Sequence, residues 1–362
     1  MTESRLLPEF APQSGVLLTW PHARTDWSGT LQAVEAVYTE IALAISSREP
    51  ALIICHDEIL QQRVSGILAR AGISPATVQY AIAASNDTWI RDYGPLGVLQ
   101  DGKPALLDFT FDGWGGKHPA GLDNTITQQL CTEGRFGASP CSSQPVVLEG
   151  GSIDTDGRGT LLTTTRCLLG SQRNPGYDRQ ALESLFQSHL GIRQILWLEH
   201  GYLAGDDTDG HIDMLARFCA PDTLVYTCCE DPGDEHYQEH QAMERQLSGF
   251  RNSAGEPYHC MPLPLPPAVY AADGQRLPAS YANFLIINAA VLVPVYAAPT
   301  DERACRVLAD CFPGREVVPV NCLPLIQQFG SLHCATMQLA EGILAPGPLP
   351  CEADERQREP GR

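Results

Sequence analysis

The chain has 362 residues, enough for one large domain or two ordinary ones, and its 43 acidic and 24 basic residues give a net charge of −19. This charge disfavours nucleic acid and anionic lipid as partners and favours small cations. Neither a signal-peptide core nor a run of about 18 apolar residues is present, so we expect a soluble cytoplasmic protein without membrane contacts. A homodimer is compatible with the sequence.

Short apolar runs alternate with longer stretches of helical periodicity, a pattern typical of the α/β class. The predicted strands span 16–20, 51–55, 78–82, 145–148, 159–163, 194–198, 223–227, 284–287, 291–295 and 316–320. The predicted helices span 31–46, 58–71, 177–189, 234–248 and 301–311, the last with Thr300 as its N-cap. The Pro-rich stretch 261–267 is expected to be a surface loop.

No long Ser-, Gly- or Pro-rich linker divides the chain, so we expect one domain over residues 1–345 and a disordered, Pro-containing charged tail over 346–362. A doubly wound nucleotide-binding fold would need a Gly-rich phosphate loop after an early strand, and Pro21-His22 and His56-Asp57 stand there instead. The spacing of strands and helices is compatible with a repeated β/α unit.

The 13 cysteines lack C-x-x-C pairs, which predicts neither a disulfide framework nor a zinc ribbon. Most are expected to be reduced and buried, and Cys167, Cys219, Cys305 and Cys311 have apolar neighbours that favour a core position. No metal site and no cofactor are predicted. The acidic stretch 205–209 lacks the spacing of a calcium loop and is interpreted as solvated.

Cys334, close to the C-terminus, is a candidate nucleophile because a thiolate is strongly nucleophilic near neutral pH. A buried core cysteine is the alternative. If residues 212–218 form a strand, His211 and Asp213 share one face, as a base beside a carboxylate would require. A surface histidine in an acidic loop is the competing interpretation.

The segment 87–95 combines Asp87 and Asp92 with Trp89, which suits a planar cation because carboxylates accept its N–H groups and an indole stacks on its face. Arg91 is a possible internal counter-ion, and an acidic turn closed by Gly94-Pro95 is the alternative. Glu149 precedes two glycines at a predicted strand end, where side chains often reach a cleft. A plain hairpin there is equally compatible, and 154–157 has the composition of a hairpin turn.

Together with 87–92, 149–151, 210–213 and 332–334, the motifs at 12–15, 19–22, 111–117 and 280–284 resemble the agmatine deiminase and bacterial-type peptidylarginine deiminase family, from about Leu7 to about Leu344. The resemblance implies a five-bladed pseudo-symmetric α/β propeller, the pentein fold, of repeated ββαβ units. It implies Cys334 as nucleophile, His211 as acid/base, and Asp92 and Asp213 as guanidinium ligands. Substrate-pocket residues would be Trp89, Glu149 and Trp114, with Asp87 beside them.

Two departures from the family pattern affect the expected pocket shape. Phe329 and Ser331 flank the single Gly330 where the family has a run of glycines, and Ala289-Ala290 replaces a glycine pair.

The resemblance therefore predicts a hydrolase that deiminates a small cationic guanidinium substrate through a covalent cysteine intermediate. Agmatine, giving N-carbamoylputrescine and ammonia in putrescine biosynthesis, is the first choice because the chain is acidic. Free arginine or peptidyl-arginine would become plausible if Arg91 or Arg173 faced the cleft. A Cys-His-Asp amidohydrolase and a catalytically silent binder of cationic ligands are the remaining alternatives.

Overall fold

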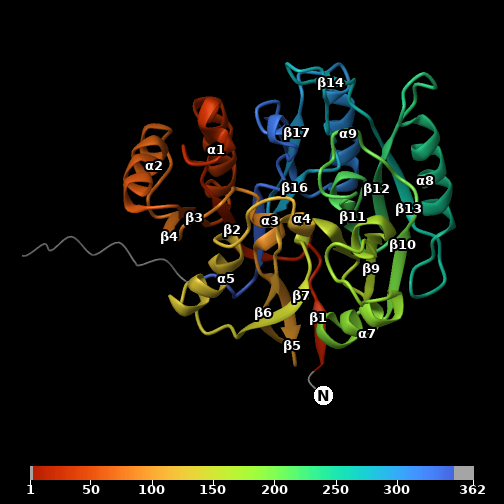
Figure 1. The fold of residues 1–362 in the computed structure, drawn as a ribbon, viewed down its shortest axis with the longest axis horizontal. Helices are drawn as coiled ribbons and strands as arrows, with labels where there is room; N and C mark the ends of the chain where they lie inside the picture. Colours follow the sequence, from red (N-terminus) through yellow and green to blue (C-terminus); the bar gives the residue numbers. More distant parts are fainter. Residues whose placement is uncertain (1–2, 346–362) are drawn as a thin grey trace, which may run out of the picture.

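The computed structural model describes residues 3–345, and the predicted tail at 346–362 lies outside them. Strands and helices alternate along this range, which confirms the α/β prediction. The longer helices lie around the outside of the molecule, whereas the short helices α3 (Ile90–Tyr93) and α4 (Gly113–Gly116) lie near the centre of the view (Figure 1). In the described part of the chain, no helix is both long and apolar enough to cross a membrane.

Besides α3 and α4, the α-helices of residues 3–345 are α1 (Leu31–Ser46), α2 (Glu58–Arg70), α5 (Asp123–Thr132), α6 (Thr165–Leu168), α7 (Arg179–Leu190), α8 (Tyr237–Gly249) and α9 (Asp301–Cys311). The 3-10 turns are η1 (Asp26–Gly29), η2 (Gly150–Ser152), η3 (Ile212–Met214) and η4 (Ile326–Gln328). The strands are β1 (Ser4–Leu6), β2 (Gln13–Thr19), β3 (Ala51–Cys55), β4 (Val78–Ile82), β5 (Leu96–Gln100), β6 (Lys103–Thr110), β7 (Cys141–Val147), β8 (Ile153–Thr155), β9 (Thr160–Thr164), β10 (Gln194–Leu198), β11 (Ala216–Ala220), β12 (Thr223–Cys228), β13 (His259–Pro264), β14 (Val269–Tyr270), β15 (Arg276–Leu277), β16 (Leu285–Ile287), β17 (Ala290–Val295), β18 (Glu316–Asn321) and β19 (Thr336–Ala340).

Most of these strands form sheets that mix antiparallel and parallel pairing. Their orders are β19-β2-β3-β4, β1-β5-β6-β7, β10-β9-β8, β11-β12-β13 and β16-β17-β18, beside a small β14-β15 pair. In each of the larger sheets an antiparallel pair is followed by a helical crossover to a parallel strand; for example, β17 pairs antiparallel with β16 and, after α9, parallel with β18. The sheet of β2 takes its antiparallel strand, β19, from the opposite end of the chain.

The helices begin and end where local chemistry favours it. The carboxylate of Asp178 accepts the N–H of Ala181 at the start of α7, and Gly191 ends that helix in the left-handed conformation with φ of 67°. In α1 the buried apolar side chains recur every three or four residues, as an amphipathic helix against a sheet requires. Thr300 stands at the N-cap position of α9 as predicted, but its side chain makes no capping hydrogen bond.

The structure corrects three predictions, which concern residues 212–218, residues 261–267 and the burial of Cys305 and Cys311. Residues 212–218 do not form one strand, because Ile212–Met214 is a 3-10 turn and β11 begins at Ala216. Residues 259–264 form strand β13 at a sheet edge, where a proline need not donate a ladder hydrogen bond. Cys131 and Cys141 form a disulfide between α5 and β7, and the other cysteines of residues 3–345 are free, as predicted for most of them. Cys167 and Cys219 are buried as predicted, whereas Cys305 and Cys311 are only half-buried.

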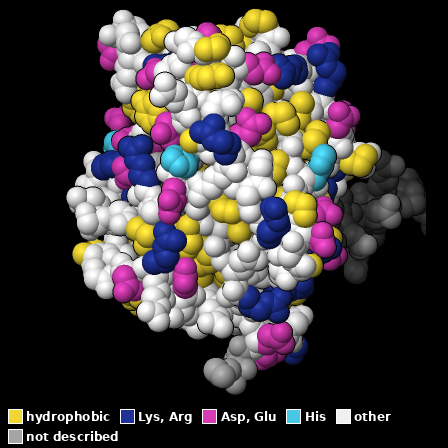
Figure 2. Space-filling model, turned by 90° about the vertical axis from the view of Figure 1, so that its right-hand side faces the viewer, with side chains coloured by type: hydrophobic (Ala, Val, Ile, Leu, Met, Phe, Trp, Pro, Cys, Tyr) yellow, Lys and Arg dark blue, Asp and Glu magenta, His cyan; other side chains and the backbone are white. Residues whose placement is uncertain are grey.

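The face of the molecule shown in Figure 2 carries basic and acidic side chains interspersed with apolar ones. Several basic side chains of the surface are paired with acids, as in the contacts of Arg303 with Glu230 and of Arg276 with Asp234. On this face, basic side chains therefore alternate with acidic and apolar ones.

Candidate active site

Residues far apart in the sequence meet at a cavity of about 140 Å³. Cys334 precedes β19, Asp92 lies in α3, and His211 and Asp213 lie at η3. The lining comprises Asp26, Asp87, Trp89, Asp92, Trp114, His118, Asp206, Asp207, Thr208, His211, Asp213, Met214, Gln328, Phe329, Gly330 and Cys334. All the candidate site residues named from the sequence are therefore brought to this cavity except Glu149, which lies behind His211.

Asp92 is held by two donors. Its Oδ1 accepts the backbone N–H of Gly151 at 2.9 Å and its Oδ2 accepts Nε1–H of Trp114, also at 2.9 Å. Burial raises its pKa to about 6, although His211 nearby acts to lower it. Because both oxygens are anchored, the carboxylate keeps one orientation towards the cavity.

Asp213 is anchored at only one oxygen. Its Oδ2 contacts Nδ1 of His333 at 2.8 Å and accepts Nδ2–H of Asn283 at 3.1 Å, whereas its buried Oδ1 has no hydrogen-bond partner among residues 3–345. Burial acts to raise its pKa, but the hydrogen bond and the charge of His333 outweigh burial and lower it. Asp213 is thus an ionised carboxylate with one acceptor oxygen left for a donor from elsewhere.

His211 lies between two carboxylates, with Nδ1 at 3.7 Å from Asp92 and Nε2 at 3.4 Å from Glu149. Burial acts to lower its pKa, but Asp92 and Glu149 raise it well above the usual value, so the ring is held as an imidazolium. Gly151 leaves space for this ring, because a Cβ there would approach its Nδ1 to 2.7 Å.

Glu149 is fully buried and accepts Nε–H of Arg173 at 2.7–2.8 Å on both oxygens. Burial acts to raise its pKa, and His211 and Arg173 together lower it, so Glu149 is ionised behind the imidazole. Ligand atoms of Glu149, Cys167 and His211 lie within 4.8 Å of one another, as a metal site would need. Arg173 already occupies the oxygens of Glu149, and we assign no metal to this group.

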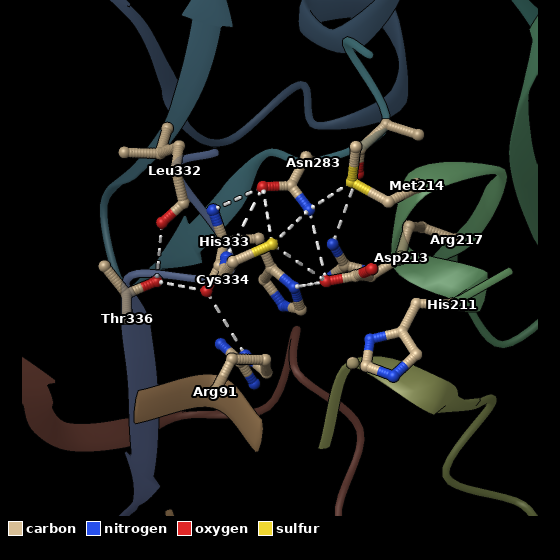
Figure 3. Close-up of polar contacts among 12 residues, drawn as sticks. Arg91, His211, Asp213, Met214, Arg217, Asn283, Leu332, His333, Cys334 and Thr336 are labelled. Atoms are coloured by element: carbon tan, nitrogen blue, oxygen red, sulfur yellow. Dashed lines mark hydrogen bonds and ion pairs between the residues drawn. The ribbon is translucent and has the colours of Figure 1, made fainter. Parts of the chain in front are cut away.

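The sulfur of Cys334 lies beside Asn283, at 3.3 Å from Nδ2 and 3.5 Å from Oδ1, and 3.8 Å from Oδ2 of Asp213 (Figure 3). Burial, followed by the charges of Asp213 and Asp92, raises its pKa well above the usual value. The free protein therefore holds Cys334 as a thiol, and a cation bound beside it would lower that pKa.

Trp89 and the loop at 329–330 form one wall of the cavity. A Cβ at Gly330 would lie 2.5 Å from ring atoms of Trp89, so only glycine fits against this indole. Phe329 adopts a left-handed conformation with φ of 64° and lines the cavity, whereas the buried Ser331 hydroxyl lies 3.0 Å from Oη of Tyr296. Of the two residues that depart from the family pattern here, Phe329 alone lines the cavity.

The acidic loop interpreted as merely solvated in fact lines the cavity, through Asp206, Asp207 and Thr208. Nε2 of His118 lies 2.8 Å from Asp207, which links this loop to the residues that follow α4. The density of carboxylates immediately before His211 was the available signal for this role.

Neither arginine that could favour an amino-acid substrate lines the cavity. Arg91 is 3% exposed, pairs with Glu9 at 3.0 Å and donates from Nε to the carbonyl of His333. Arg173 donates to Glu149, Asp209 and the carbonyl of Thr208. Both guanidinium groups are therefore occupied by internal partners.

Comparison with known proteins identifies the family of this chain. The family model described as Porphyromonas-type peptidyl-arginine deiminase matches residues 5–340. The chain belongs to this family. An agmatine deiminase of Stutzerimonas stutzeri is 32% identical over 359 residues, covering 91% of this chain and 94% of the relative.

Two solved structures of the family are similar over nearly the whole chain. One from Porphyromonas gingivalis, provisionally named an arginine deiminase, has a TM-score of 0.89 and 47% identity and covers 94% of this chain and 100% of its own. An agmatine deiminase of C. jejuni, solved with substrate bound, has a TM-score of 0.87 and 33% identity, over 94% and 98% of the two chains. This member of the deiminase family is a hydrolase that acts on carbon–nitrogen bonds of guanidines.

Proposed function

We propose that this enzyme hydrolyses agmatine to N-carbamoylputrescine and ammonia, with Cys334 as the nucleophile. The supporting observation is the composition of the cavity, where carboxylates surround a thiol and no arginine or lysine is among the described lining residues. A guanidinium group can donate to the open Oδ1 of Asp213 and to Asp92, while Trp89 and Trp114 contribute aromatic surface.

In the proposed first half-reaction, the bound cation lowers the pKa of Cys334, the thiol releases its proton to solvent, and the thiolate attacks the central guanidinium carbon. His211 donates its proton to the departing nitrogen, so that ammonia leaves and a cationic thiouronium remains on the sulfur. Glu149, ionised behind the ring, stabilises the charged imidazole before transfer.

In the second half-reaction, the neutral imidazole of His211 removes a proton from water, and the resulting hydroxide attacks the thiouronium carbon. Collapse of this adduct breaks the carbon–sulfur bond. The hydroxyl proton of the adduct passes to the departing sulfur, the ureido product leaves, and the thiol and the imidazolium are restored.

The choice of agmatine follows from the carboxylates at the two ends of the cavity. Asp92 and Asp213 stand beside the thiol, and Asp206 and Asp207 offer further carboxylates for the distal ammonium of a dication. A substrate carboxylate would meet these acids without an arginine or lysine among the described lining residues to pair with, because Arg91 and Arg173 are occupied internally.

The experiment is a panel measuring ammonia release from agmatine, free arginine and a C-terminal peptidyl-arginine, with the Cys334→Ser variant as the control. Release from agmatine alone supports the proposal, and release mainly from either arginine compound contradicts the substrate assignment. Tight binding of agmatine by the wild type without ammonia release would identify a silent binder.

The arrangement of the sheets is part of the same proposal. We infer that the five mixed sheets are the blades of a pseudo-symmetric propeller formed by one domain over residues 1–345. Their recurring order, an antiparallel pair followed by a crossover to a parallel strand, supports this arrangement.

A further inference from the structure

A buried amide, that of Asn283, lies between the thiol and one of the carboxylates. Asn283 precedes β16 and is fully buried. Its Oδ1 accepts the backbone N–H of His333 at 2.9 Å and of Cys334 at 3.4 Å. Because only the carbonyl end of an amide can accept two N–H groups, these contacts determine which end is nitrogen, and Nδ2 points towards Asp213 and the sulfur (Figure 3).

The two hydrogens of Nδ2 have three acceptors within reach. Oδ2 of Asp213 lies at 3.1 Å, Sδ of Met214 at 3.1 Å and Sγ of Cys334 at 3.3 Å. The carboxylate is the strongest acceptor and takes one hydrogen. The second faces two sulfur atoms, and a thioether is a weak acceptor, so ionisation of Cys334 would draw this hydrogen to the thiolate.

We propose that Asn283 is a further catalytic residue, whose side-chain N–H donates to the Cys334 thiolate while its carbonyl holds the backbone of the same cysteine. The inference rests on the proposed function, in which Cys334 is the nucleophile. It assigns to Asn283 a role in stabilising the attacking sulfur, in addition to holding the backbone of the loop that carries Cys334.

The charge of the site explains why a neutral donor is suited to this position. Burial, Asp213 and Asp92 all raise the pKa of Cys334, whereas the hydrogen bond from Asn283 lowers it. A lysine or arginine here would also stabilise the thiolate, but its charge would repel the guanidinium substrate. An amide stabilises the anion and leaves the attraction for the cation intact.

The amide of Asn283 can also accept a hydrogen bond from Cys334 when the sulfur is a protonated thiol. The thiol lies 3.5 Å from Oδ1 of Asn283 and 3.8 Å from Oδ2 of Asp213, either of which can accept its hydrogen. The sulfur therefore has a partner before and after ionisation, without movement of the backbone.

The test compares the pH dependence of iodoacetamide labelling of Cys334 in the wild type, Asn283→Asp and Asn283→Ala. Labelling is followed by mass spectrometry of the peptide that contains Cys334, because other free cysteines are present. Asp keeps an oxygen for the two backbone N–H groups and loses the donor. We expect the labelling midpoint of both variants to rise by about 1 to 2 pH units, since a hydrogen bond to a charged group is worth that much in pKa.

Turnover provides a second readout that a purely structural role would not produce. We expect kcat at neutral pH to fall roughly 10- to 100-fold and to recover as the pH rises towards the new thiol pKa. Asn288→Ala is the matched control, because its amide likewise bridges a backbone N–H and carbonyl, those of Gln13, and lies outside the cavity lining. Its midpoint should equal that of the wild type.

Unchanged labelling midpoints in folded Asn283 variants, or a loss of turnover that does not recover with pH, would overturn the proposal. If both variants fail to fold, Met214→Leu provides the measurement, because it removes the competing sulfur at nearly constant volume. Its midpoint should fall, and a midpoint that does not fall contradicts the proposal. Labelling needs no substrate, so these results are distinguishable from a failure of agmatine turnover.

Discussion

Replacing Asp213 by Asn tests the carboxylate that has one open oxygen. The Asn carbonyl can keep the contacts to His333 and Asn283, which places the amide nitrogen at the position of the unpaired Oδ1. Asp213 is fully buried, and loss of one partner of such a charge pair costs about 2 to 5 kcal/mol. Since about 1.4 kcal/mol corresponds to a factor of ten, kcat/KM for agmatine should fall roughly 30- to 5,000-fold.

Stability should change much less than activity in this variant. Exchange of a charge-assisted hydrogen bond for a neutral one costs about 1 kcal/mol, which corresponds to a decrease of roughly 1–2 °C in melting temperature for a chain of this length. Asp154→Asn is the matched control, because Asp154 is also buried but pairs with Arg217 away from the cavity. We expect it to lose stability while retaining kcat/KM.

The assay is initial-rate ammonia release at several agmatine concentrations, combined with thermal unfolding of each variant. A kcat/KM of Asp213→Asn within about threefold of the wild type would show that the open oxygen does not bind the substrate, since threefold is less than 1 kcal/mol. The reasoning would also be refuted if the loss of activity were accompanied by a large fall in melting temperature that accounts for it.

The Glu149→Gln variant should lower the pKa of His211, because Glu149 helps to raise it, and the alkaline limb of the kcat–pH profile should move to lower pH; an unmoved limb contradicts the pairing. A non-reactive guanidinium ligand that leaves the sulfur accessible should accelerate iodoacetamide labelling of Cys334, and slower labelling with access verified counts against substrate-assisted ionisation. Burial raises the pKa of Asp123 to about 8, so between about pH 4 and 8 the folded state binds more protons than the unfolded state and stability falls as pH rises. Asp123→Asn should flatten this dependence in urea unfolding, and an unchanged slope would argue against it.

The local hydrophobic pattern was sufficient to predict the bounds of the helices and strands that have strong periodicity. The predicted bounds of α1, α9, β3, β4 and β10 match the observed ones. The hairpin of β5 and β6 was missed, although its Asp101-Gly102 turn, with both φ angles positive, is a standard hairpin signal. Strand β13 could not be recognised from its prolines, because they are tolerated only through its position at a sheet edge.

For the chemistry of the site, the sequence identified the reactive residues but not their contacts. Residue types and motifs were enough to name Cys334, His211, Asp92 and Asp213, because few side chains can serve as nucleophile, acid or guanidinium ligand. Asn283, whose side chain contacts the sulfur of Cys334, was marked in the sequence only by its place in the motif at 280–284. Its contact with Cys334 spans 51 residues of sequence, and the contact of Asp213 with the same sulfur spans 121.

Sequence order thus specified which elements form and which reactive groups are available, since both depend on neighbouring residues and side-chain chemistry. The folded chain alone determines that Arg91 and Arg173 turn to internal carboxylates, that Glu149 stands behind His211, and that an oxygen of Asp213 is left open. These outcomes depend on long-range packing, in which each polar group takes the partner that distant segments bring within hydrogen-bond reach.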